Sequence, residues 1–283
     1  MPALERIFET AREKSLRVVM PEIEDPRISN AAQQLETERL ARVVGLSEPT
    51  QAMVDVLVSE RGMKEAIAVR MLKKPLIRAA AMVAAGEADV MVAGADNPTK
   101  RVIEAASLAI GLKDGVDVPS SFFLMLFPDG REFVFADCAV NVAPDASELA
   151  SIAKSSATSA RALLGAAEVA MLSFSTGTSA TGESVGLVRQ ASELCGFAGP
   201  IQADAALNPV IAAKKGLGEG RANVLIFPDL DAGNIAYKLC QELGGAQSVG
   251  PILQGFKKPV CDLSRGASVD DIIAASAVTL TMV

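Results

Sequence analysis

Residues 259–272 read Pro259-Val-Cys-Asp-Leu-Ser-Arg-Gly-Ala-Ser-Val-Asp-Asp-Ile272, and the rest of the chain is organised around this stretch. It predicts a short extended segment that breaks at Gly266 and restarts as a helix. Ser268 suits the N-cap position, and Asp271 lies where a capping-box acid belongs. Ser264 and Arg265 then lie beside the free N–H groups of the helix N-terminus. This arrangement suits an anion, because helix N-termini carry partial positive charge.

Composition limits the class of protein. The chain has 283 residues, enough for one large or two moderate domains, and half of them are apolar. The net charge is −7, which disfavours nucleic-acid binding, because that needs a basic face. The sequence contains no uninterrupted run of about eighteen apolar residues, so we expect no membrane-spanning helix. The first residues lack the pattern of a secretory signal, so we expect a soluble cytoplasmic protein.

Histidine is absent from the sequence, and the four cysteines are scattered. A Ser-His-Asp triad or a histidine-ligated metal is therefore excluded, and neither a zinc ribbon nor a disulfide framework is expected. Proton transfer falls to a carboxylate, Lys, Cys, Tyr or the substrate. We expect no metal.

The apolar pattern predicts an α/β fold. Short strands over 16–20 and 41–45 flank a helix over 27–37, which gives a β-α-β start typical of doubly wound sheets. A Gly- and Pro-containing segment, 111–121, is interpreted as a crossing between domains. Further elements are expected as a strand over 88–93, a hairpin over 121–137, and helices over 146–164, 184–195 and 235–243. Residues 47–74 are ambiguous, with helical parts.

Two polar loops join predicted strands to helices. Residues 173–184 are dense in hydroxyls and glycine and could cradle a phosphate. They are not a P-loop, because Glu183 stands where that motif needs lysine. Residues 227–234 form the second loop, in which Asp231 or Asn234 could instead be a helix N-cap. Loops at the carboxyl ends of parallel strands lie at one edge of a sheet, where ligands bind.

Several ordered motifs resemble the phosphate acetyltransferase family. They are Asp262-Leu-Ser-Arg-Gly266, Ser268-Val-Asp-Asp-Ile272, Val224-Leu-Ile-Phe-Pro-Asp-Leu-Asp-Ala-Gly-Asn234 and Met171-Leu-Ser-Phe-Ser-Thr-Gly-Thr-Ser179, with shorter matches from Pro21-Glu22 and Asp25-x-Arg27 onward. The resemblance extends from about residue 17 to the C-terminus and is poor only over 46–75.

The resemblance implies the reversible transfer of an acetyl group between CoA and phosphate. In the family, residues corresponding to Ser264, Arg265 and Asp271 are catalytic. The acid deprotonates the CoA thiol, the serine stabilises the oxyanion, and the arginine holds the phosphate. CoA or acetyl-CoA is then a substrate, and no cofactor is tightly bound.

The resemblance also implies two α/β/α domains with mostly parallel sheets, an inter-domain cleft and a homodimer. The expected domains are residues 1–115 plus 252–283, which carry the C-terminal catalytic motif, and residues 116–251, which carry the two polar loops. The expected phosphate- or acyl-binding residues are Ser175, Thr176, Thr178, Asn234 and Gly266. The expected CoA-binding residues are Lys257, Lys100 and Arg101.

Two acidic residues depart from the family pattern. Glu242 and Glu104 stand where arginines are usual, which predicts weaker binding of an anionic substrate. Three alternatives stay open: a non-catalytic acyl-CoA-binding or regulatory module, a phosphate butyryltransferase, and a two-domain dehydrogenase. A dehydrogenase is disfavoured because no strand is followed by a Gly-x-Gly-x-x-Gly turn. Asp271 itself could be only a helix cap.

Overall fold

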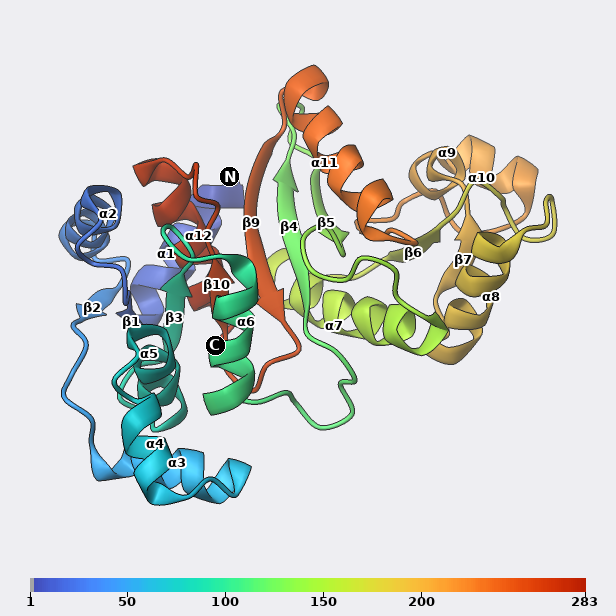
Figure 1. The fold of residues 1–283 in the computed structure, drawn as a ribbon. Coiled ribbons are helices and arrows are strands. Elements are labelled where there is room, and N and C mark those ends of the chain that lie inside the picture. The colour runs from blue at the N-terminus through green and yellow to red at the C-terminus, as the bar shows by residue number, and fades with distance from the viewer. Residues whose placement is uncertain (1–2) are drawn as a thin grey trace. The chain divides into compact units, whose positions relative to one another are not determined.

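A computed structural model describes residues 3–283. The chain forms two compact units, one of Met1–Asp114 with Val249–Val283 and one of Gly115–Ser248. Each contains helices and a mainly parallel sheet (Figure 1), so the predicted α/β class is confirmed. Within residues 3–283, no helix is both long and apolar enough to cross a lipid bilayer.

The sheet of the first unit is built from segments that lie far apart in the sequence. Its strand order is β2-β1-β3-β10-β9, in which the first four strands are parallel and β9 is antiparallel to β10. The strands are β2 (Arg42–Val44), β1 (Arg17–Val19), β3 (Val90–Ala93), β10 (Val260–Asp262) and β9 (Gln247–Gln254). β10 therefore inserts a late segment between β3 and β9.

Two groups of helices pack within this unit. α12 contacts α1 and α2, whereas α5 contacts α3 and α6. The residues of α12 from Ile272 to Thr281 are buried, which explains its continuous apolar sequence. The helices are α1 (Ala3–Lys14), α2 (Pro26–Thr37), α3 (Gln51–Arg61), α4 (Glu65–Met71), α5 (Pro75–Ala84), α6 (Thr99–Ala109) and α12 (Val269–Thr281).

The second unit has the strand order β4-β5-β8-β6-β7, in which β4 and β5 form an antiparallel hairpin and the others are parallel to β5. The strands are β4 (Ser120–Leu126), β5 (Glu132–Ala136), β8 (Val224–Ile226), β6 (Val169–Leu172) and β7 (Ala198–Ile201). The helices are α7 (Ala146–Leu164), α8 (Glu183–Cys195), α9 (Ala203–Leu207), α10 (Pro209–Lys215) and α11 (Leu230–Gly244).

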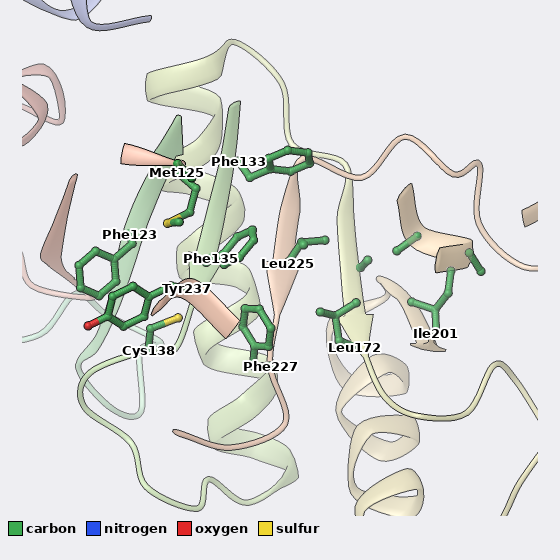
Figure 2. Close-up of a cluster of buried hydrophobic side chains, with 14 residues drawn as sticks. Phe123, Met125, Phe133, Phe135, Cys138, Leu172, Ile201, Leu225, Phe227 and Tyr237 are labelled. Atoms are coloured by element: carbon green, nitrogen blue, oxygen red, sulfur yellow. The ribbon is translucent and has the colours of Figure 1, made fainter. Parts of the chain in front are cut away.

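Aromatic side chains form much of the core of the second unit (Figure 2). Phe123 of β4 stacks on Tyr237 of α11 with ring centroids 4.2 Å apart. Phe135 of β5 lies against Phe227, which follows β8. The stacking of Tyr237 on Phe123 holds α11 against β4, and with it the polar residues at the start of that helix.

The structure confirms several predicted elements and corrects others. The hairpin over 121–137 is present, and α7 has the predicted bounds. Residues 47–74 contain α3 and α4. The helix expected over 235–243 begins earlier, at Leu230, because the side chain of Asp229 accepts a hydrogen bond from Ala232 N at 2.8 Å.

Candidate functional site

Three neighbouring parallel strands of the first unit end at one edge of its sheet. β1, β3 and β10 are followed by residues 20–25, 94–98 and 263–268. The last two segments are joined directly, because Leu263 N donates to Ala93 O at 2.6 Å. The carboxyl ends of parallel strands are where α/β proteins bind ligands. Three polar connections therefore share one candidate ligand-binding edge.

The segment between β10 and α12 has the predicted capping box. The Ser268 side chain accepts a hydrogen bond from Asp271 N at 3.2 Å. The Asp271 Oδ2 atom accepts from Ser268 N at 3.0 Å and from Ser268 Oγ at 2.7 Å. Asp271 is exposed, so its carboxylate is both a cap and accessible to a ligand.

Residues 264–266, which lie shortly before this cap, turn outward. Ser264, Arg265 and Gly266 are all exposed. Gly266 N donates to Ser264 Oγ at 3.3 Å, and Ala267 N donates to Ser264 O at 2.9 Å. Within the described part of the chain, the Arg265 guanidinium has no ion-pair partner. A hydroxyl, a free guanidinium and a helix N-terminus thus lie within a few residues, which suits a phosphate.

Asp262, the last residue of β10, is the most perturbed carboxyl of this edge. Its exposed fraction is 1%, and Thr99 Oγ1 donates to its Oδ2 at 2.5 Å. Its Oδ1 is buried without a hydrogen-bond partner in the described structure. Burial raises the pKa of Asp262 to about 7, an effect that the Thr99 hydrogen bond opposes and the Glu22 charge reinforces. Sequence analysis did not predict this raised pKa, because Asp262 was considered only as part of the Asp262-Leu-Ser-Arg-Gly266 motif.

Glu22 and Arg27 also contribute to this edge, and sequence reasoning missed both roles. Glu22 accepts hydrogen bonds from the segment after β3, and Arg27 donates to the segment after β10. These contacts join residues 72 and 238 positions apart in the chain. No local pattern encodes such contacts, and the only available signal was the pair of short family matches, Pro21-Glu22 and Asp25-x-Arg27.

The basic residues expected to bind CoA lie in two places. Lys100 and Arg101 are exposed in the first turn of α6, at the candidate ligand-binding edge after β3, and Glu104 is exposed one turn later. Lys257 lies ahead of β10, at the end of that strand opposite to Ser264, and its ammonium pairs with Glu60 at 3.1 Å. The structure thus brings Lys100 and Arg101, but not Lys257, to the edge that carries Ser264.

The second unit has a polar loop of its own, over residues 173–182, between β6 and α8. Ser175 and Thr176 are buried, and their hydroxyls bond within the unit: Ser175 Oγ accepts from Ala180 N at 3.0 Å, and Thr176 Oγ1 accepts from Gln202 N at 3.1 Å. Thr178 is exposed at the tip of the loop. The buried hydroxyls therefore shape the loop, and Thr178 is exposed to solvent.

Asn234 lies in the second turn of α11 and is not its N-cap, so that interpretation is wrong for Asn234 and, since Asp229 is the cap, for Asp231. Asn234 Nδ2 donates to Cys138 O at 3.1 Å, next to Asp137 at the end of β5. The Asp137 carboxylate accepts from the backbone N–H groups of residues 139–141. Sequence analysis also missed this role of Asp137, because the N–H groups that it accepts from belong to a segment without a recognisable motif.

Within residues 3–283, no group of three or more His, Cys, Asp or Glu side chains is placed to hold a metal ion. The four cysteines are free thiols. Burial raises the pKa of Cys138 and that of Cys261, so both favour the neutral thiol.

Comparison with known proteins identifies the family. Residues 48–280 match the family model described as phosphate acetyl/butaryl transferase. The phosphate acetyltransferase of Paracoccus denitrificans is 40% identical over 313 residues, which cover 99% of this chain and 98% of that protein. That of Acetivibrio thermocellus is 38% identical, covering 99% and 97%.

Two solved structures are similar throughout. The EutD phosphotransacetylase from Staphylococcus aureus has a TM-score of 0.89 and 33% identity, with 98% of each chain covered. A phosphotransacetylase from Streptococcus pyogenes has a TM-score of 0.88 and 34% identity, again with 98% of each chain covered. The likeness extends over nearly the whole chain. This chain therefore belongs to the phosphate acetyl/butaryl transferase family.

Proposed function

We propose that this protein is a phosphate acetyltransferase, which moves an acetyl group reversibly between CoA and inorganic phosphate. The observation that carries this proposal is the outward turn of Ser264, Arg265 and Gly266 at the carboxyl end of β10, followed by the N-terminus of α12. Such a turn offers an anion a guanidinium and backbone donors at one place. Family membership supplies the reaction.

The proposed step is a direct attack without an acyl-enzyme. The CoA sulfur attacks the carbonyl carbon of acetyl phosphate, its proton passes to the Asp271 carboxylate, and the bond between that carbon and the phosphate oxygen breaks as phosphate leaves. The Ser264 hydroxyl donates to the developing oxyanion, and Arg265 pairs with the phosphate. Asp271 Oδ2 already holds the helix cap, so we assign the proton to Oδ1.

Other residues are proposed to bind the rest of the substrates. Ser175, Thr176, Thr178, Asn234 and Gly266 are proposed for the phosphate or acyl group. Lys100, Arg101 and Lys257 are proposed for CoA. The exposure of Lys100 and Arg101 at the edge that carries Ser264 supports those two most directly. CoA enters as a substrate, and no tightly bound group is required.

The test is a coupled assay of thioester formation from acetyl phosphate and CoA. We expect turnover by the wild type and a loss of about 10²-fold or more in Ser264→Ala and in Arg265→Ala, since one oxyanion donor is typically worth that much. Ser29→Ala, at an exposed position of α2, is the control. Repeating the assay with propionyl and butyryl substrates tests the butyryltransferase alternative. A wild type that binds acetyl-CoA without turnover would favour the regulatory module.

We also propose that the protein acts as a homodimer in the cytoplasm, where its proposed substrates occur. Ile235, Leu239 and Leu243 of α11 repeat every four residues and have exposed fractions of 56%, 51% and 83%. An exposed apolar stripe of this kind often marks a protein–protein interface, and a second copy could cover it isologously. Light scattering of Leu239→Glu against the wild type tests this. A wild type that is monomeric at assay concentrations would refute the dimer.

A further inference from the structure

One carboxylate holds the turn that follows β3. Glu22, in the connection between β1 and α2, accepts from Gly94 N at 2.8 Å, Ala95 N at 2.9 Å and Asp96 N at 3.1 Å, and from Asn97 Nδ2 at 2.6 Å. Four donors on one carboxylate leave this turn little freedom, because hydrogen bonds to an ionised acceptor are strong.

One guanidinium joins that turn to the segment that carries Ser264. Arg27 donates to both carboxylate oxygens of Asp25, at 3.2 Å and 2.7 Å. It also donates to Arg265 O at 2.7 Å, Ala267 O at 3.1 Å and Ala95 O at 3.2 Å. Its Nη1 therefore bridges two carbonyls of the turn after β10, and its Nη2 reaches the turn after β3.

An ordinary surface ion pair would not need these contacts. The Arg27 guanidinium lowers the pKa of Asp25 through their hydrogen bonds, and that pair is complete without any carbonyl. The second unit contains such a pair, Arg131 with Asp129, also two residues apart and with an N–O distance of 2.7 Å. Arg131 does not bond the carbonyls of a distant segment in the described structure. The additional carbonyls at Arg27 therefore indicate a second role.

We propose that Glu22 and Arg27 are positioning residues for the acyl transfer, acting by fixing the backbone from which the Ser264 hydroxyl and the Arg265 guanidinium project. Neither residue reacts. Glu22 accepts hydrogen bonds from backbone N–H groups and Arg27 donates to backbone carbonyls. Ala95 is bonded by both, through its N–H to Glu22 and through its carbonyl to Arg27. Positioning matters because a displacement of about 1 Å can reduce a rate by about 10²-fold. This inference rests on the proposed function, in which Ser264 and Arg265 take part in acyl transfer.

The experiment compares Arg27→Met, Arg27→Lys and Glu22→Gln with the wild type, with Arg131→Lys as the matched control. We expect Arg27→Met to lower kcat by about 10²-fold while the KM for CoA changes less than about threefold. Arg27→Lys keeps the charge, but a single ammonium cannot reproduce the planar fork, so it should recover only part of the loss. Arg131→Lys should keep wild-type kcat.

Hydrogen exchange of residues 94–97 and 263–268 adds a measurement that does not depend on turnover. We expect faster exchange in both segments of Arg27→Met, with the melting temperature lowered by only a few degrees. The inference is overturned by wild-type kcat in Arg27→Lys, by a loss of kcat that only follows the unfolded fraction, or by unchanged exchange in the two segments. An inactive wild type whose variants still exchange faster would refute the proposed function and leave the backbone contacts supported.

Discussion

Replacing Asp262 with asparagine should stabilise the protein above neutral pH and not below it. Asp262 is buried, and burial raises its pKa from 3.8 in the unfolded chain to about 7 in the folded protein. Between these values the folded state holds a proton that the unfolded state releases. The contribution of Asp262 to the free energy of unfolding is therefore most favourable below about pH 4. It falls as the pH rises from there through about 7. Asparagine, which stays neutral, avoids that loss.

The magnitude follows from the two pKa values. The difference between 3.8 and about 7, at about 1.36 kcal/mol per pKa unit, corresponds to about 4 kcal/mol at high pH. Most of the change measurable in a folded sample, about 2–3 kcal/mol, falls between about pH 5 and pH 8. The buried amide of asparagine adds an unpaired donor, which costs about 1–3 kcal/mol at every pH. We therefore expect Asp262→Asn to gain about 1–3 kcal/mol at about pH 8 and to gain nothing at about pH 5.

Urea unfolding followed by far-ultraviolet circular dichroism, repeated across this pH range, measures the difference. Asp114→Asn, at an exposed carboxyl, is the control and should follow the wild type. The informative quantity is the slope with pH of the difference between Asp262→Asn and wild type, because the cost of the unpaired amide does not depend on pH. A difference that is constant between pH 5 and 8 would show that Asp262 does not hold a proton near neutrality, and the reasoning would fail.

Four further predictions concern single variants and the removal of metal ions. Asp271→Asn should lower kcat at least about 10²-fold, because it removes the proposed general base. Loss of a helix cap alone typically costs about 0.5–2 kcal/mol of stability and leaves kcat nearly intact, so early melting with near wild-type turnover would make Asp271 a cap alone. Glu242→Arg and Glu104→Arg should lower the KM for phosphate or CoA, more so at low ionic strength, and a KM unchanged at low salt for both substrates would place these positions outside the site. Gly94→Ala should destabilise the protein by at least about 2 kcal/mol in chemical unfolding, because its φ is +110° and a Cβ there would lie 2.5 Å from Asp262 Oδ1. Exhaustive chelation should leave activity intact, and restoration by one divalent ion would contradict this.

Local sequence patterns predicted the parts of the fold that are set locally. The capping box of Ser268 and Asp271 was visible because both partners lie within one helical turn. The hairpin over 121–137 was visible because Pro128-Asp-Gly130 is a strong turn between apolar runs. The start of α11 was misplaced, because several acidic and amide residues near 229–234 could each have been its cap, and the structure has Asp229 in that role.

The supports of the candidate site could not be predicted in the same way. Glu22 and Arg27 act on backbone groups that a pattern of side chains does not encode, across more than seventy positions of sequence. The pKa of Asp262 depends on its burial and on Thr99 and Glu22, which follow two other strands. β7 was missed because Ala-Gly-Pro-Ile has neither alternation nor β-branched residues at its start. Each of these depends on which segments become neighbours.

The insertion of β10 between β3 and β9 has a consequence for synthesis on the ribosome. A nascent chain that ends before residue 249 contains all of the second unit, whose aromatic core is then complete. The same nascent chain has β1, β2 and β3 with the inner edge of β3 unpaired, and α1 and α2 lack the buried helix against which they pack. Chaperones bind unpaired strand edges and exposed apolar faces, and the same features promote aggregation. The later unit should therefore fold first, and residues 1–114 should need protection until residues 249–283 emerge.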